Sequence, residues 1–251
     1  MTLIVGINCS DGVVLGADGA TTYATMGRPT IRQEVKTKLK IIGGCLVLGV
    51  SGPVGLGQRF AGEVESLNIH RTTYRKEHLA MSTLRSVFWR QMEPEYKMAE
   101  VAKELLGPVA QQSVLSASLL ALPINGVPTL VGCDQQASFE VVKSFTTIGS
   151  GQANADPFLA FVRRIFWNNR LPSLVDGIFS TLWTLEQAIS TAPGGVAHPI
   201  QMITLDKDCN AHEVSDEDLE EHRQAIALAE DALAGFRDPK NKGEIEAPPE
   251  S

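Results

Sequence analysis

Alternation of apolar and polar positions makes the first 60 residues the most informative part of the chain. Apolar residues fill positions 4–7 and 13–17, and between these runs stands Asp11-Gly12, a dipeptide that favours the backbone of a tight hairpin turn. We therefore predict two antiparallel strands at the start of the chain. The second strand leads directly into an acidic residue, Asp18.

A second hairpin is predicted downstream. Strand-like residues run over 35–42 and 45–50, and Gly43-Gly44 lies between the two runs. The second run ends in a glycine-rich turn, Ser51-Gly52-Pro53-Val54-Gly55, after which apolar residues recur with helical spacing. The turn is therefore expected to connect a strand to a helix.

The same periodicities predict the remaining elements. Asn125-Gly126 between two apolar runs marks a third hairpin, and Pro94 is expected to kink or split a long helix. The order of elements is typical of an α+β fold rather than of alternating βα units. The predicted elements are helices over 53–68 and 76–106, strands over 113–122, 128–132 and 139–148, helices over 156–167 and 174–191, and a closing strand over 199–205.

Residues 206–251 differ in composition from the rest, and we expect them to form an acidic C-terminal extension to a domain that spans 1–205. They carry 14 acidic and 5 basic side chains, so the net charge of −7 arises in this extension. The acidity therefore says little about the surface of the main domain.

A helix is predicted within the extension, from about 216 to 236. Ser215-Asp216-Glu217-Asp218 is a helix-start signature, with acidic residues at the positive end of the helix dipole. Leu219, Ile226 and Leu233 recur every seven residues, so this helix could dock along a neighbour. Residues 238–251 are expected to be disordered.

Composition excludes several classes of protein. The sequence has no apolar run of about 18 residues, which a transmembrane helix needs, no secretory signal pattern, and no basic stripe with interleaved aromatic residues for nucleic acid. We expect a cytoplasmic protein without metal or cofactor. The cysteines, Cys9, Cys45, Cys133 and Cys209, and the histidines, His70, His78, His198, His212 and His222, show no metal-ligand spacing.

Candidate chemistry begins at Thr2. An initiator methionine is usually removed before a small residue, and removal would place a free α-amino group beside the Thr2 hydroxyl. A threonine hydroxyl is a poor nucleophile without an adjacent base, and an α-amino group has an unperturbed pKa of about 7.7–8.0. Nucleophile and general base then occur on one residue. Many chains begin with Met-Thr, so this pattern gains weight only from other motifs.

Several motifs agree in order and spacing with one family. Thr2 opening a strand, Asp-Gly-Val-Val-Leu-Gly-Ala-Asp ending at Asp18, Lys38-Leu39, and Gly-x-Ser-Gly over Gly49 to Gly52 resemble a proteasome β-type subunit, an N-terminal-nucleophile (Ntn) hydrolase. The resemblance covers residues 2–205 and is strongest over 2–60. The segment between Asp18 and Lys38 is a few residues longer than in the family. With no propeptide before Thr2, the chain is most similar to the bacterial proteasome homologues.

The resemblance implies a fold, an activity and partners. The fold would be a four-layer αββα sandwich, in which two antiparallel sheets pack face to face under helices on both outer sides. The activity would be that of a self-compartmentalising threonine endopeptidase. Its partners would be further copies of itself in a homo-oligomeric ring, stacked in pairs, a peptide or unfolded protein substrate, and, by analogy, an ATP-dependent unfoldase.

The resemblance also implies a role for each site residue. Thr2 would be the nucleophile, Lys38 would lower the pKa of its amine, and Asp18 would hold Lys38 charged and oriented. The Gly52 N–H would face the oxyanion, and Ser150 would hydrogen-bond near the amine. Each residue taken alone has a simpler interpretation: a turn acid, a strand lysine, a helix-entry glycine and an N-cap serine.

Substrate-binding positions also follow from the resemblance. Val50 corresponds to the base of the primary pocket, and valine would shorten that pocket and favour modest apolar side chains. The lysines nearby could admit acidic side chains. The residues around Val50 are Thr21, Ser51 and Val54, with Lys36 and Lys40.

One position departs from the family. Where the family has an Asp-x-x-Ser pair before its last Gly-Gly, this chain has Ser190 and Pro193 before Gly194-Gly195. Two alternatives to a peptidase stay open. One is a ring subunit that has lost catalysis, and the other is an Ntn amidohydrolase that uses Thr2 on a small amide.

Overall fold

Two five-stranded antiparallel sheets form the centre of the molecule in the computed structural model, which describes residues 2–25, 28–34, 37–71, 74–107, 114–168, 170–191 and 195–236. The first sheet has the order β10 (Phe145–Gly149), β1 (Leu3–Asn8), β2 (Gly12–Ala17), β11 (Gln201–Asp206) and β12 (Ala211–Glu213). The second has the order β5 (Leu39–Ile42), β6 (Leu46–Ser51), β7 (Ala117–Ile124), β8 (Val127–Cys133) and β9 (Phe139–Val141).

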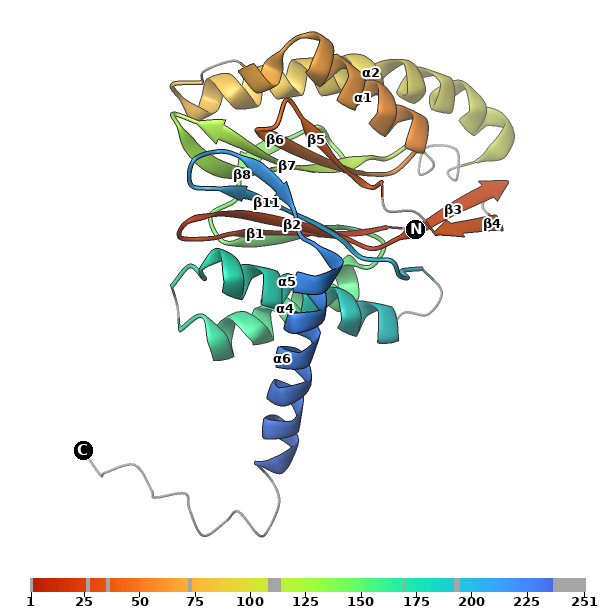
Figure 1. Ribbon diagram of the computed structural model, residues 1–251. Helices are drawn as coiled ribbons and strands as arrows, with labels where there is room; N and C mark the ends of the chain where they lie inside the picture. Colours follow the sequence, from red (N-terminus) through yellow and green to blue (C-terminus); the bar gives the residue numbers. More distant parts are fainter. Residues whose placement is uncertain are drawn as a thin grey trace, which may run out of the picture.

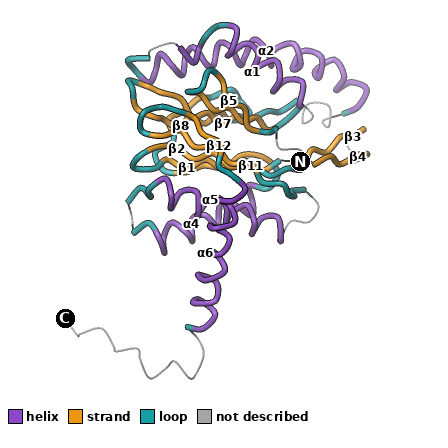
Figure 2. The backbone as a smooth tube through the Cα atoms, viewed as in Figure 1, coloured by secondary structure: helices purple, strands orange, loops and turns teal. Residues whose placement is uncertain are grey.

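Helices cover the outer face of each sheet (Figures 1 and 2). The second sheet is covered by α1 (Val54–Ser66) and α2 (Glu77–Leu106), which are joined through the short helix η1 (Ile69–Arg71). The first sheet is covered by α4 (Gln152–Phe166) and α5 (Leu174–Thr191). This arrangement confirms the predicted α+β class. None of the helices among the described residues is both long and apolar enough to cross a membrane.

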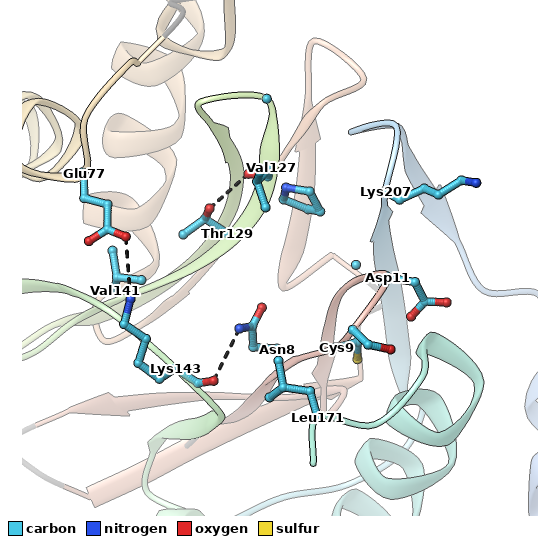
Figure 3. Close-up of a pocket in the computed structure, with 14 residues that line it drawn as sticks. Asn8, Cys9, Asp11, Glu77, Val127, Thr129, Val141, Lys143, Leu171 and Lys207 are labelled. Atoms are coloured by element: carbon cyan, nitrogen blue, oxygen red, sulfur yellow. Dashed lines mark hydrogen bonds and ion pairs between the residues drawn. The ribbon is translucent and has the colours of Figure 1, made fainter.

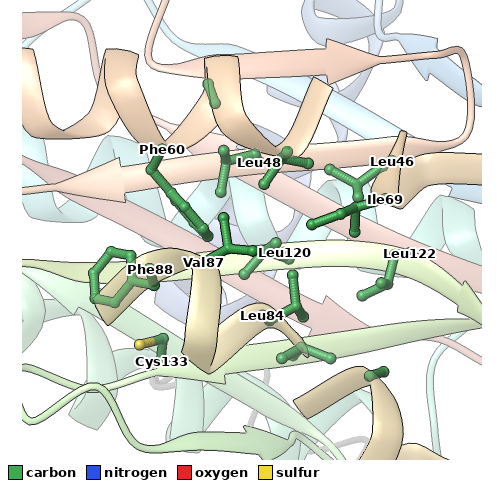
Figure 4. Packing of buried hydrophobic residues seen from close by; sticks show 14 of the residues in the cluster. Leu46, Leu48, Phe60, Ile69, Leu84, Val87, Phe88, Leu120, Leu122 and Cys133 are labelled. Atoms are coloured by element: carbon green, nitrogen blue, oxygen red, sulfur yellow. The ribbon is translucent and has the colours of Figure 1, made fainter. Parts of the chain in front are cut away.

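Apolar side chains fill three layers. Between the second sheet and its helices, Phe60 and Phe88 pack edge to face with ring centroids 4.8 Å apart (Figure 4). Strand β1 is buried on both faces, because Ile4 points between the sheets while Leu3 and Val5 point towards α4 and α5. A strand buried on both faces needs a continuous apolar run. The first strand is therefore fixed in position at the residue that follows Thr2.

The three predicted hairpins are present. Strands β1 and β2 pair across the Asp11-Gly12 turn, and β5 and β6 pair across Gly43-Gly44. Asn125 and Gly126 both have positive φ angles, 54° and 74°, between β7 and β8. Two consecutive positive φ angles define the type I′ turn, which Asn-Gly favours.

The prediction of a single strand over 139–148 is wrong. The segment forms β9, which pairs with β8, and β10, which pairs with β1 in the other sheet. The chain changes sheets between them, because Val142 N–H still donates to Leu130 in the second sheet (2.9 Å) whereas Ser144 accepts from Asn8 in the first (2.7 Å). An apolar run does not reveal such a change, since both halves are partly or fully buried.

The long helix α2 is continuous from Glu77 to Leu106, so a split at Pro94 is wrong. Pro94 lacks an N–H to bond the carbonyl of Arg90, and its exposed position leaves that carbonyl open to water. Three strands were not predicted. They are β12 and a hairpin of β3 (Ala20–Thr25) with β4 (Arg28–Glu34), which lies between Asp18 and Lys38 in the sequence.

Helix α6 (Asp216–Gly235) confirms the helix predicted in the extension. Ser215 and Asp218 form a capping box at its start. Leu219 and Ile226 are buried in the apolar layer between the first sheet and its helices, and Glu230 accepts a hydrogen bond from the Trp183 indole of α5 (2.9 Å). Leu233, the last position of the seven-residue repeat, is 46% exposed and does not dock. The end of α6 beyond these contacts projects past α4 and α5 (Figure 1). Residues 238–251 lie outside the described residues, and the division of the chain at 205 stays a prediction.

Candidate active site

The carboxylate of Asp18 is the centre of the site. It lies directly after β2 with 1% of its surface exposed. One oxygen, Oδ1, accepts from Leu3 N–H (2.8 Å) and from the Lys38 ammonium (2.5 Å). The other, Oδ2, accepts from Ala20 N–H (2.9 Å) and Ala197 N–H (3.2 Å). Four donors from four segments of the chain therefore meet on one buried carboxylate.

Lys38 is the cation of this arrangement, and its side chain is 8% exposed. Burial lowers the pKa of Lys38 from its ordinary value of 10.5, while the charge and hydrogen bond of Asp18 act in the opposite direction. Leu3 N–H and the Lys38 ammonium bind the same carboxylate oxygen. The ammonium therefore lies beside the backbone that begins with Thr2.

A glutamine that the sequence did not single out fixes the backbone next to Lys38. The Gln201 amide accepts from Leu39 N–H (2.9 Å) and donates to Leu39 carbonyl (3.1 Å). Gln201 is buried on β11, where it pairs with Ala17, the residue before Asp18. The two sheets are therefore tied together where Asp18 and Lys38 meet. A lone glutamine before an apolar strand gives no signal of this role in the sequence.

Thr2 lies at the edge of this centre and is held by the turn that follows β10. Its nitrogen donates to Ser150 Oγ (3.2 Å), and its carbonyl accepts from Gly151 N–H (3.3 Å). Gly149 has a φ of 103°, and a Cβ built there would lie 2.1 Å from the Thr2 carbonyl oxygen. Only glycine allows both this conformation and this approach. The Gly-Ser-Gly sequence therefore serves to bring β10 against Thr2.

The state of the Thr2 nitrogen decides what it can do. With Met1 attached it is a peptide nitrogen, whose lone pair is delocalised into the carbonyl, and it cannot accept a proton near neutral pH. After removal of Met1 the same atom becomes an amine beside the Ser150 hydroxyl. The arrangement can supply a nucleophile with its own base only in the processed chain.

Gly52 reaches the same end of the molecule from the second sheet. It follows β6 with a φ of 128°, and a Cβ built there would lie 2.8 Å from the carbonyl oxygen of Leu115. The neighbouring Ser51 hydroxyl lies 3.2 Å from the Cβ position of Gly149. The glycine-rich turn therefore approaches the residue that contacts Thr2.

Two of the positions expected to bind substrate adjoin this turn: Val50 directly precedes it and Val54 lies within it. Val50 is half-buried and packs against Gly57 of α1, while Val54, at the start of α1, is 50% exposed. Thr21 is half-buried on β3 and directly follows Ala20, whose N–H donates to Asp18. Lys40 forms an exposed ion pair with Glu65 (2.9 Å), and Lys36 lies outside the described residues. Their part in binding substrate stays a prediction.

The departure from the family falls at the end of α5. The Ser190 hydroxyl donates to the carbonyl of Gln187 within its own helix (2.9 Å), so it does not serve the Thr2 amine. Pro193 and Gly194 lie outside the described residues. The next segment still supports the site, because Ala197 donates to Asp18 and accepts from Gly19 N–H (2.6 Å).

A separate cavity of about 450 Å³ lies at the opposite end of β1, around the Asn8–Gly12 turn (Figure 3). It contains an ion pair between Lys143 and Glu77 (3.6 Å). Burial, with nearby Asp11 and Asp176, raises the pKa of Cys9 far above its ordinary value, so this thiol stays protonated and unreactive. The described part of the chain holds no group of three or more metal-ligating side chains. The Asp18 centre is therefore the better candidate for catalysis.

Comparisons with known proteins give the fold. No family model matches the chain, and no curated protein matches it. Among solved structures, an Anbu mutant from Hyphomicrobium sp. strain MC1 is 18% identical with a TM-score of 0.66, covering 98% of this chain and 99% of that one. The helical assembly of the Anbu complex from Pseudomonas aeruginosa contains a chain that is 16% identical with a TM-score of 0.65, covering 98% of each chain. The described part of the chain therefore has the fold of these proteins.

Replacing Asp18 by asparagine tests how much its carboxylate contributes to the stability of the fold. The amide would present its NH₂ group to N–H donors whichever way it turned, and Lys38 would lose its counter-ion. Removing one partner of a buried ion pair typically costs about 3–5 kcal/mol. We expect Asp18→Asn to lower the free energy of unfolding by about that amount in urea denaturation. Glu140→Gln, at an exposed position on β9, is the control and should change it little; equal effects of the two substitutions would contradict this account.

Proposed function

We propose that this chain is a proteasome-like Ntn hydrolase, with the four-layer αββα sandwich of that group, and that it cleaves peptide bonds with Thr2 after Met1 is removed. The observation that carries the proposal is the buried Asp18–Lys38 pair, which lies against the backbone of Thr2 and Leu3. A buried cation beside a terminal amine would lower the pKa of that amine and keep it available as a base. The likeness to the Anbu structures supports the fold on which the proposal rests.

The first step is the attack of Thr2. The α-amine takes the hydroxyl proton while Oγ1 bonds to the carbonyl carbon of the substrate. The positive charge of Lys38 disfavours a second positive charge nearby, so it lowers the pKa of the amine and keeps more of it in the neutral, basic form. Asp18 holds Lys38 in place. Ser150, which contacts the Thr2 nitrogen, orients the amine.

The second step is the breakdown of the tetrahedral intermediate. The Gly52 N–H stabilises the negative oxygen, a contribution of about 3–4 kcal/mol for donors of this kind. The C–N bond of the substrate breaks, and the leaving nitrogen takes the proton from the Thr2 ammonium. The ester on Thr2 is then hydrolysed by a water molecule that gives its proton to the same amine. The enzyme returns to its starting state without any cofactor.

Self-association is the second part of the proposal. The Anbu complex from Pseudomonas aeruginosa forms a helical assembly. We infer that this chain also assembles with copies of itself, as a ring or stacked ring whose chamber contains Thr2. Confinement in a chamber would limit the substrates to unfolded chains and peptides, delivered in the case of proteins by an ATP-dependent unfoldase. With Val50 at the base of its pocket, the site would prefer modest apolar side chains.

Replacement of Thr2 tests the activity. Thr2→Ala retains a small second residue, so Met1 is still removed, but the hydroxyl is lost. We expect peptide hydrolysis to fall to background, a loss on the order of 10⁶ in kcat for removal of a triad nucleophile, with the oligomeric state unchanged by light scattering. Thr2→Ser is the matched control and should retain activity. Undiminished hydrolysis by Thr2→Ala would refute the mechanism, and hydrolysis of small amides alone by the wild type would favour an amidohydrolase.

The pH dependence of kcat/KM tests the role of Lys38. At low pH the Thr2 amine is protonated and cannot act as a base, so kcat/KM should fall along an acid limb that reports the pKa of this amine. Because Lys38 lowers that pKa, the limb should lie below the unperturbed value of about 7.7–8.0. Because burial lowers the pKa of Lys38, the ammonium is lost as pH rises towards 10.5. This loss breaks the buried ion pair with Asp18 that orders the site, so an alkaline limb should appear below that value. In Lys38→Met we expect the acid limb to move to higher pH. An acid limb that stays in place would show that Lys38 does not act on the amine.

A further inference from the structure

Ser116 contacts the peptide that carries the proposed oxyanion donor. It immediately precedes β7, and only 1% of its surface is exposed. Its hydroxyl donates to the carbonyl oxygen of Ser51 over 2.9 Å. The next residue, Ala117, pairs with Ser51 at the end of the β6–β7 ladder. The Ser116 hydroxyl therefore binds the first peptide beyond the paired part of β6.

The geometry of that peptide links Ser116 to the site. The carbonyl of Ser51 and the N–H of Gly52 belong to one planar unit, and in a trans peptide they point in opposite directions. When Ser116 binds the carbonyl on the β7 side, the Gly52 N–H must point away from β7. On its other side, the Ser51 hydroxyl lies 3.2 Å from the Cβ position of Gly149, the residue that contacts Thr2. The hydrogen bond thus decides the direction of a donor at the site.

Because residue 52 is glycine, its own backbone preference does not fix the orientation of the Ser51–Gly52 peptide. A rotation of the Ser51–Gly52 peptide would change φ of Gly52, and glycine accepts positive and negative φ almost equally. Its present φ of 128° is one that other residues rarely adopt. A Cβ at this position would also lie 2.8 Å from Leu115 carbonyl and 2.9 Å from Ser116 Oγ, so the packing against β7 requires glycine. The residue that permits the close packing cannot by itself select the orientation.

We propose that Ser116 is a positioning residue that fixes the Ser51–Gly52 peptide with its N–H directed at the oxyanion. This inference rests on the proposed function, in which that N–H stabilises the tetrahedral intermediate. Without the hydroxyl, the peptide would divide its population between two orientations, and in one of them the carbonyl of Ser51 would face the developing negative charge. Ser116 itself touches neither the substrate nor the reacting atoms.

The kinetic test compares two serines on one stretch of chain. Ser116→Ala should lower kcat about tenfold or more, up to the 10²–10³ that loss of an oxyanion donor costs, with KM unchanged. The acid limb of the pH profile should also stay in place, because the Thr2 amine is intact. Ser116→Thr, which keeps the hydroxyl, should restore most of kcat. The control is Ser118→Ala, since Ser118 is also buried but its hydroxyl lies beside the Cys133 thiol.

Several outcomes would overturn the inference. They are a kcat of Ser116→Ala within twofold of the wild type, a loss confined to KM, or an equal loss of kcat in Ser118→Ala. If Ser116→Ala does not fold, Ser116→Cys, of similar size but a weak donor, should show the same selective loss of kcat. If wild-type kcat is retained in Ser116→Cys, the inference is equally wrong.

A crystal structure of Ser116→Ala separates this inference from the proposed function. An inert wild type would refute the proposed function, but the orientation of the Ser51–Gly52 peptide can be seen regardless of activity. We expect that peptide to be reversed, or present in two orientations, in the variant. A single orientation identical to that of the wild type would show that Ser116 does not fix the peptide.

Discussion

The buried ion pair of Asp18 and Lys38 is the interaction on which the rest of the site depends. Its carboxylate receives N–H groups from the start of β1, from β3 and from the segment before β11, as well as the ammonium. A buried carboxylate is tolerated only when such donors satisfy it. One side chain therefore holds three backbone segments and Lys38 beside Thr2, so a change in it is expected to affect both the stability of the fold and the geometry of the site.

The two sheets make different contributions to the site. The first supplies Thr2, Asp18 and the Gly149 turn, whereas the second supplies Lys38 and Gly52. Closely packed apolar side chains between the sheets hold these residues in fixed positions relative to one another. The two hydrogen bonds of the Gln201 amide to the Leu39 backbone do the same at the site itself. A site built from two closely packed layers needs no induced closure to bring these groups together.

Much of the fold could be predicted from local chemistry. Asp11-Gly12 and Asn125-Gly126 identify their hairpins because few dipeptides fit such turns, and Ser215 with Asp218 identifies the start of α6 because a cap needs those groups. Features that depend on distant segments could not be predicted. The change of sheets at 142–144, the hold of Gln201 on Leu39 and the bond of Ser116 to Ser51 each join residues far apart in sequence. Motif spacing and the family resemblance identified the candidate site residues in the sequence. Only the structure shows that Asp18, Lys38 and the Thr2 backbone lie close together.

The central claim is that Thr2 combines a hydroxyl and a free amine in an assembled site. The most direct measurement is the intact mass of the protein before and after incubation with a peptide epoxyketone, a reagent that requires both groups on one residue. Our account predicts a starting mass that lacks Met1 and a single adduct, located on the peptide that begins with Thr2. Full retention of Met1 would contradict the account and favour a subunit without catalysis. Loss of Met1 without any adduct would contradict an assembled peptidase site.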